Sequence, residues 1–153
     1  MSPRHRALVT DGGNAIVEFV FVAVIVLVPL IYLIVAVATV QRSSLAVSQA
    51  AREAGRAFAT SDTAADAMVR ARAAAGIALR DQGLPDDVEL RFVAAGSSCD
   101  APAAEPELRA GAVFTVCVVR PVALPAVPSI LEGRGIVTVG EYVVHVDDYR
   151  TVR

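Results

Sequence analysis

A single carboxylate stands at the start of a long apolar stretch near the beginning of the chain. Residues 13–19 read Gly-Asn-Ala-Ile-Val-Glu-Phe, and apolar residues follow almost without interruption. An ionised carboxylate inside a membrane helix costs about 2.5–3.5 kcal/mol on insertion scales. We therefore expect Glu18 to have a partner of opposite charge. The alternative is that Glu18 lies near the lipid headgroups and extends its carboxylate towards water.

The apolar stretch is long enough to cross a lipid bilayer. From Val20 to Val40 there is no charged side chain, and only Pro29, Tyr32 and Thr39 interrupt the apolar residues. An α-helix of this length spans roughly 32 Å, which matches a hydrocarbon core of about 30 Å. Because valine, isoleucine and leucine occur all round such a helix, the pattern predicts a transmembrane helix over residues 14–41.

The charges before the stretch predict its orientation. Arg4 and Arg6 precede it and only Asp11 opposes them, which favours a cytoplasmic leader of residues 1–13 and export of everything after the span. Arginines on the other side, at positions 42, 52 and 56, work against this orientation.

A cleaved secretory signal is an alternative to a membrane anchor. Its nearest cleavage site is Ala36-Val37-Ala38. The apolar stretch is, however, longer than the roughly 7–15 apolar residues of such a signal. The anchor is therefore the preferred interpretation.

The residues around Glu18 resemble the processing motif of type IV prepilins, in which a glycine is followed by four residues, a glutamate and an aromatic residue. The resemblance implies cleavage between Gly13 and Asn14, so that Glu18 and Phe19 become the fifth and sixth residues of the mature chain. It also implies that cleavage leaves an ammonium on Asn14. In pilin-like assemblies the glutamate meets such an ammonium, and each charge neutralises the other where water is scarce.

Over about residues 11–40 the chain resembles the TadE-like proteins, the minor pilins (pseudopilins) of the tight-adherence, or Flp, pilus machinery. Those proteins share the motif, carry a proline such as Pro29 in the span, and continue into a small exported domain. The resemblance implies a structural role in pilus assembly, in the bacterial inner (cytoplasmic) membrane with a single pass, and a second location in the pilus itself. The implied partners are the lipid bilayer, other pilin subunits, the assembly machinery and a prepilin peptidase. Alternatives are a signal-anchored exported binding module and a pseudopilin of a secretion system.

Helical periodicity continues beyond the membrane stretch, over an exported helical region of residues 42–83. A stalk is predicted to about Ala59, with one apolar stripe made by Val47, Ala50, Ala51, Ala54 and Phe58. A second helix is predicted from Thr63 to Gln82, because Thr63-x-x-Asp66 resembles a capping box and Gly83 suits the position after a helix end. Its expected apolar face consists of Ala64, Met68, Ala71, Ala75 and Leu79.

After Gly83 the periodicity changes to two, which indicates strands in an exported β-sheet region of residues 84–153. Strands are predicted over Val88–Phe92, Ala112–Arg120 and Ile136–Val146, with Gly140 as a possible bulge. Prolines 121, 125 and 128 exclude a regular element between the last two strands. That apolar loop either covers the sheet or contacts a partner. The predicted fold class is α+β, with about three antiparallel strands.

The only two cysteines, Cys99 and Cys117, form an even pair in a region predicted to be exported. This pattern favours a disulfide, which would contribute about 3 kcal/mol to stability. Two separate thiols are the alternative. We expect no metal site, because the cysteines are far apart in sequence and His145 is the only histidine in the exported region.

Neither an enzyme nor a nucleic-acid-binding protein is predicted. The sequence has no catalytic motif; Gly133-Arg134-Gly135 suits a turn, and Asp147 and Asp148 suit solvated positions after a strand. His145 is expected to be structural. A formal net charge of −2 and the absence of tryptophan give no basic, aromatic surface for nucleic acid. We expect no catalytic residue and no cofactor.

Overall fold

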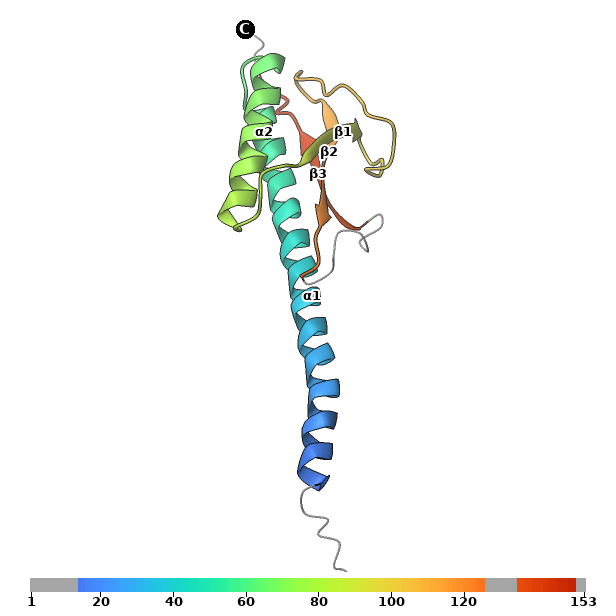
Figure 1. The fold of residues 1–153 in the computed structure, drawn as a ribbon. Coiled ribbons are helices and arrows are strands. Elements are labelled where there is room, and N and C mark those ends of the chain that lie inside the picture. Colours follow the sequence, from blue (N-terminus) through green and yellow to red (C-terminus); the bar gives the residue numbers. More distant parts are fainter. Residues whose placement is uncertain (1–13, 126–134, 151–153) are drawn as a thin grey trace, which may run out of the picture. The chain divides into compact units, whose positions relative to one another are not determined.

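The computed structural model describes residues 14–125 and 135–150. These residues form two helices and three strands, an α+β fold as predicted (Figure 1). By their contacts the chain divides into two units, Met1–Ala36 and Val37–Arg153. The elements are α1 (Asn14–Ala59), α2 (Ala64–Asp81), β1 (Glu89–Ala94), β2 (Val113–Val122) and β3 (Ile136–His145).

Helix α1 is one continuous helix of 46 residues, which joins the predicted membrane segment to the predicted stalk. Pro29 lies inside it. Proline has no N–H to donate, so the carbonyl of Ile25 loses its usual helical partner, but the helix continues through this position. The predicted end of the stalk at Ala59 is confirmed.

The C-terminal part of α1 lies against the rest of the second unit through its alanine-rich stripe. The five residues predicted for this stripe are all fully buried: Val47, Ala50, Ala51, Ala54 and Phe58. The ring of Phe58 packs between those of Phe92 and Phe114, with centroid distances of 5.3 and 5.1 Å. These three rings form the aromatic part of the core.

Helix α2 begins and ends as its sequence predicts. Thr63 is the N-cap, and its hydroxyl oxygen accepts a hydrogen bond from the backbone N–H of Asp66 at 3.2 Å. At the other end Gly83 has a φ of 66°, which glycine adopts without strain. The N–H groups of Gly83 and Leu84 donate to the carbonyls of Arg80 and Leu79, which is the Schellman arrangement.

The predicted apolar face of α2 is wrong at one position. Ala64 is exposed, whereas Met68 is half-buried and packs against the core. The buried residues are instead Ala67, Ala71, Ala75, Gly76, Ala78 and Leu79. Five of these six residues are alanine or glycine, which lets α2 approach the core closely, and Met68 lies at the margin of the stripe.

The sheet is antiparallel throughout, in the order β1-β2-β3. All three strands match their predicted ranges to within two residues, and β2 extends past Arg120 to Val122. The expectation that Pro121 lies outside any regular element is therefore wrong. Strand β1 pairs with β2 only as far as Val119. Beyond that residue β2 has no β1 partner, so the missing N–H of Pro121 breaks no hydrogen bond between these two strands. Pro128 lies outside the described residues.

Gly140 is not a bulge, since the register of β2 with β3 continues through it without a shift. Its role is to let α1 approach β3. A Cβ atom at Gly140 would lie 2.2 Å from the carbonyl oxygen of Val47, in the backbone of α1. Gly55 of α1 has the matching role, because a Cβ there would lie 2.5 Å from Cγ2 of Val144.

We expect Gly140→Ala to lower the free energy of unfolding by about 1–3 kcal/mol, because the methyl group would push α1 away from the sheet. The matched control is Gly76→Ala. An added Cβ there has no contact closer than 3.4 Å, and alanine in a helix is better than glycine by up to about 1 kcal/mol. The measurement is protease resistance of the detergent-solubilised chain as a function of urea. Equal shifts in the same direction for both variants would contradict the close contact.

Candidate functional site

The predicted processing and assembly residues lie at the start of α1. Asn14 is the first residue of the helix, and Gly13 lies outside the described residues. Glu18 comes four residues after Asn14, so the two positions share one face of the helix, about 6 Å apart along its axis. The Cα–Cβ bonds of a helix tilt towards its N-terminus, so a side chain at position 18 can reach back to the backbone at position 14.

The helix start itself attracts a negative charge. The first N–H groups of a helix have no partner within it, and the aligned peptide dipoles add a partial positive charge there. This combination favours a carboxylate within the first turn by about 0.3–1 kcal/mol, and the effect is weaker at Glu18, which lies beyond that turn. An ammonium group on Asn14 would add a full charge to the same place.

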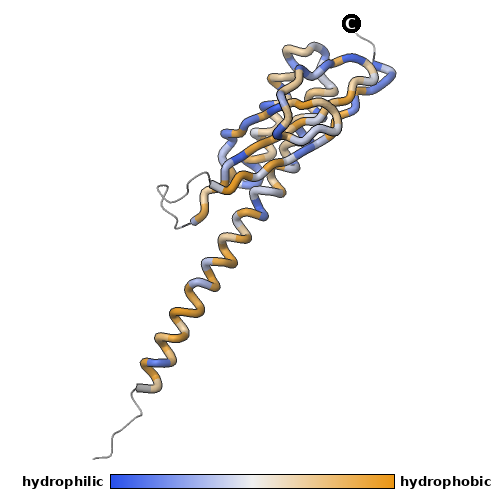
Figure 2. The backbone as a smooth tube through the Cα atoms, turned by 90° about the vertical axis from the view of Figure 1, so that its right-hand side faces the viewer, coloured by the Kyte–Doolittle hydropathy of each residue, from blue (hydrophilic) through white to orange (hydrophobic). Residues whose placement is uncertain are grey.

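Around Glu18, the surface of α1 is apolar on every side. Large apolar side chains from Ile16 to Ile34 are exposed in the chain by itself, among them Phe19 at 74% and Phe21 at 65%. Figure 2 shows this part of the helix as an almost continuous hydrophobic segment. Within the part of the chain that the structure describes, α1 is the one helix long and apolar enough to cross a membrane. A surface of this composition suits contact with lipid or with other apolar helices.

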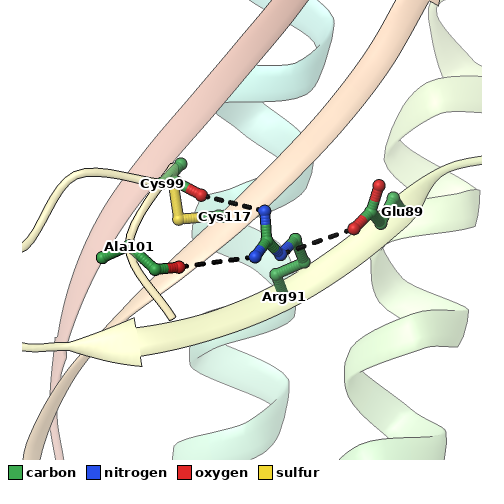
Figure 3. The surroundings of a disulfide bond; sticks show 5 residues. All are labelled: Glu89, Arg91, Cys99, Ala101 and Cys117. Carbon is green, nitrogen blue, oxygen red and sulfur yellow. Dashed lines mark hydrogen bonds and ion pairs between the residues drawn. A yellow bond between two sulfur atoms is a disulfide. The ribbon is translucent and has the colours of Figure 1, made fainter. Parts of the chain in front are cut away.

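The second predicted pair of residues is joined in the structure. Cys99 and Cys117 form a disulfide across a sequence separation of 18 (Figure 3). Both cysteines are buried, next to Val93. The bond ties the loop after β1 to the central strand, on the side of the sheet that faces away from Phe92 and Phe114.

Arg91 holds the same loop by hydrogen bonds. Its guanidinium donates to the carbonyl oxygens of Cys99 at 3.1 Å and Ala101 at 3.4 Å, and lies 3.4 Å from the carboxylate of Glu89 (Figure 3). Arg91 pairs directly with Cys117 across the two strands. The alternating pattern of β1 predicted a strand here but gave no sign of this role, because the acceptors are backbone carbonyls in a loop.

Two further arginines bind the C-terminal ends of the helices, a role that the sequence did not predict. Arg42 donates to the carbonyl of Gln82 at the end of α2. Arg150 donates to the carbonyls of Ala59, at 2.7 Å, and Ser61, at the end of α1. The last carbonyls of a helix lack helical partners and carry partial negative charge, so a guanidinium is well suited to them.

A shallow pocket of about 470 Å³ lies over β2 and β3. It is lined by Gly96, Ser97, Ser98, Thr115, Glu141, Tyr142 and Val143, which supply hydroxyl groups and one carboxylate. Among residues 14–125 and 135–150, no three histidine, cysteine, aspartate or glutamate side chains are grouped so that they could hold a metal ion. His145 lies 3.6 Å from Asp148, and Asp147 accepts a hydrogen bond from the N–H of Tyr149.

We expect both cysteines to resist alkylation in the unfolded chain until a reductant is added. Replacing Cys99 or Cys117 by alanine should each cost about 3 kcal/mol of stability. The double replacement should cost little more than one single replacement, since either one already removes the bond. Urea midpoints of protease resistance test this. Fully additive losses would show that the two side chains stabilise the domain independently.

No protein-family model, no curated protein and no solved structure matches this chain. Its function is therefore inferred from α1, Glu18 and the disulfide-bonded domain.

Proposed function

We propose that the chain is a minor pilin of the tight-adherence type, anchored by α1 in the bacterial inner membrane with its N-terminus in the cytoplasm. The observation that carries this proposal is Glu18, the only charged side chain from Asn14 to Val40 of an otherwise apolar helix. Its position relative to Gly13 and Phe19 supports processing by a prepilin peptidase, and Pro29 in the span fits the same class of protein.

In the proposed mechanism, the apolar surface of α1 lets the helix pack against other helices, and the charge of Glu18 selects the partner. The exposed apolar surface of α1 packs equally well against lipid or against neighbouring helices, so it does not by itself select a partner. A buried pair of opposite charges does select one. Breaking such a pair costs about 3–5 kcal/mol, because one charge is left without its partner in a medium of low dielectric constant.

The spacing of Asn14 and Glu18 suggests how the charge is kept paired before assembly. After cleavage, the ammonium of Asn14 and the carboxylate of Glu18 lie on one helix face, a little more than one turn apart. They can neutralise each other within a single subunit while it waits in the membrane. During assembly, the ammonium of an adjacent subunit takes over this position, so that neither charge is exposed to lipid alone.

The alternatives differ in what they require of the N-terminus. A permanently anchored binding module needs no cleavage, whereas a minor pilin or a secretion-system pseudopilin does. Processing therefore separates the binding module from the two assembly functions. The partner recovered with the protein then separates those two.

We expect the mature chain to begin at Asn14, and Gly13→Leu to leave the leader attached, because the peptidase must accommodate the residue before the cut. Gly12→Leu is the matched control and should be processed normally. Mass spectrometry of the purified membrane protein gives the N-terminus directly. An uncleaved N-terminus in the natural chain would contradict processing.

We expect Glu18→Leu to insert into the membrane and fold normally but to lose association with other pilins by more than about a hundredfold, as a loss of 3–5 kcal/mol implies. Glu18→Gln should behave like Glu18→Leu, because it keeps the shape and removes the charge, and Glu18→Asp should rescue in part. Val17→Leu is a control for the helix surface. Crosslinking and piliation are measured beside membrane yield. Normal pili with Glu18→Leu would rule out charge pairing as the mechanism.

A further inference from the structure

The end of the sheet where β2 stops and β3 starts has an apolar surface. Ile136, Val137 and Val139 are 41%, 49% and 41% exposed, and Pro121, the partner of Val137 in the register, is also exposed. These four residues are called the apolar end of the sheet below. Side chains alternate along a strand, so Val137, Val139 and Pro121 share the outer face and Ile136 lies on the opposite face. Exposed apolar residues on both faces of one end of the sheet mark a surface that meets something apolar.

Contacts between β3 and α1 show where this apolar end lies along the helix. The hydroxyl groups of Ser43 and Thr138 are hydrogen-bonded at 2.9 Å, and both side chains are buried. Further on, Gly140 lies against the backbone of Val47. From the first contact to the second, the residue number rises in both α1 and β3. The strand and the C-terminal part of α1 therefore run in the same direction (Figure 1).

These contacts place the apolar end of the sheet beside the last residues of the uncharged segment, residues 20–40. Ile136 precedes Thr138 by two residues, which is about 7 Å of strand. The same distance along α1 from Ser43 takes between four and five residues, at about 1.5 Å each. Ile136 is therefore level with Thr39, and Val40 is the last residue before the first polar residues Gln41 and Arg42.

The segments of α1, β2 and β3 that meet at this level carry two arginines. In residues 37–48, 118–125 and 135–140 the only charged side chains are Arg42 and Arg120, both positive. Arg120 is partly exposed, and its buried Nε has no hydrogen-bond partner within the described residues. Phospholipid headgroups on a bacterial membrane are zwitterionic or anionic, so the partly exposed Arg120 suits their phosphate groups.

An exposed leucine extends the apolar surface to the other side of α1. Leu45 is 73% exposed. At 100° per residue it points away from Ser43 and Val47, which face the sheet. Apolar groups on two sides of the helix at one level fit a surrounding lipid layer better than a partner that covers one face. Arg42 donates to a carbonyl at the end of α2, so the side of the helix that faces α2 is polar at this level.

We propose that the apolar end of the sheet is seated in the headgroup layer of the membrane that α1 crosses, with Ile136, Val137 and Val139 reaching the boundary of the acyl chains. The headgroup layer is roughly 5–8 Å thick on each side, which is the depth that separates Val40 from Ser43 to Leu45. The domain then has two membrane attachments, α1 and the apolar end. This inference needs α1 to span the membrane but does not depend on a role in pili.

The test uses the full chain in vesicles of phosphatidylethanolamine and phosphatidylglycerol. A fluorophore is attached to Val137→Cys without reductant, so that the native disulfide leaves only the new thiol reactive. The matched control is Val143→Cys, a valine on the same face of the same strand and 55% exposed. It lies about 20 Å further along β3, beyond the headgroup layer. We expect a nitroxide carried by the lipid to quench the label at position 137 several-fold more than at 143, and aqueous iodide to do the reverse.

Two results would overturn the proposal. One is equal iodide quenching at both positions with no effect of the lipid nitroxide. The other is protection of position 137 from iodide that depends on the protein-to-lipid ratio without lipid quenching, which would assign the surface to a second copy or another protein. Val139→Cys, also on the outer face, provides a second position in the apolar end should Val137→Cys fail to fold. Protease resistance equal to that of the natural chain is required of each variant.

Discussion

The contact between the backbones of α1 and β3 is the constraint on which the domain depends. Gly140 and Gly55 bring the helix closer to the strand than any side chain would allow. At that distance only small residues fit along the helix, which explains the buried run of alanines in α1. Larger side chains then occupy the space further up the sheet, where Phe58, Phe92 and Phe114 meet. The same contact allows the short hydroxyl groups of Ser43 and Thr138 to reach each other.

Arginine side chains donate hydrogen bonds to backbone carbonyls at helix ends and in a loop. Arg42 and Arg150 each bind carbonyls at the C-terminal end of a helix, and Arg91 binds two carbonyls of the loop after β1. A guanidinium can serve several acceptors at once because it presents five N–H groups in one plane. A lysine in these positions would keep the charge but lose the paired geometry. These arginines therefore act as structural parts of the domain, in addition to giving it charge.

Elements defined by local signals were predictable, and those defined by distant contacts were not. The stripe of α1, the Thr63 cap and the Gly83 stop follow from neighbours within a few residues, and all three are present. The face of α2 was misassigned because alanines on several sides give no clear preference. The sequence predicts a possible bulge at Gly140, since nothing near it in sequence indicates that α1 passes there. Pro121 is predicted to lie outside the sheet. It fits within β2 because β1 ends before reaching it, and the sequence does not show where β1 ends relative to β2. At the site, the cysteine pair followed from composition, whereas Arg42, Arg91 and Arg150 bind carbonyls that no motif marks.

The hydrogen bond of Arg150 to the end of α1 has a consequence for the order in which the domain forms. Arg150 and Ala59 are 91 positions apart, and Ser43 and Thr138 are 95 apart. At a synthesis rate of about 5–20 residues per second, the helix waits on the order of 5–20 s for its partners in β3 and at the C-terminal end. Helix α2 follows α1 directly, so the alanine-rich surfaces can associate first and shield part of the stripe during that interval. The sheet side of α1 stays uncovered until the last residues have been made, which makes this interval the time when an exposed strand or helix is most open to capture by another chain.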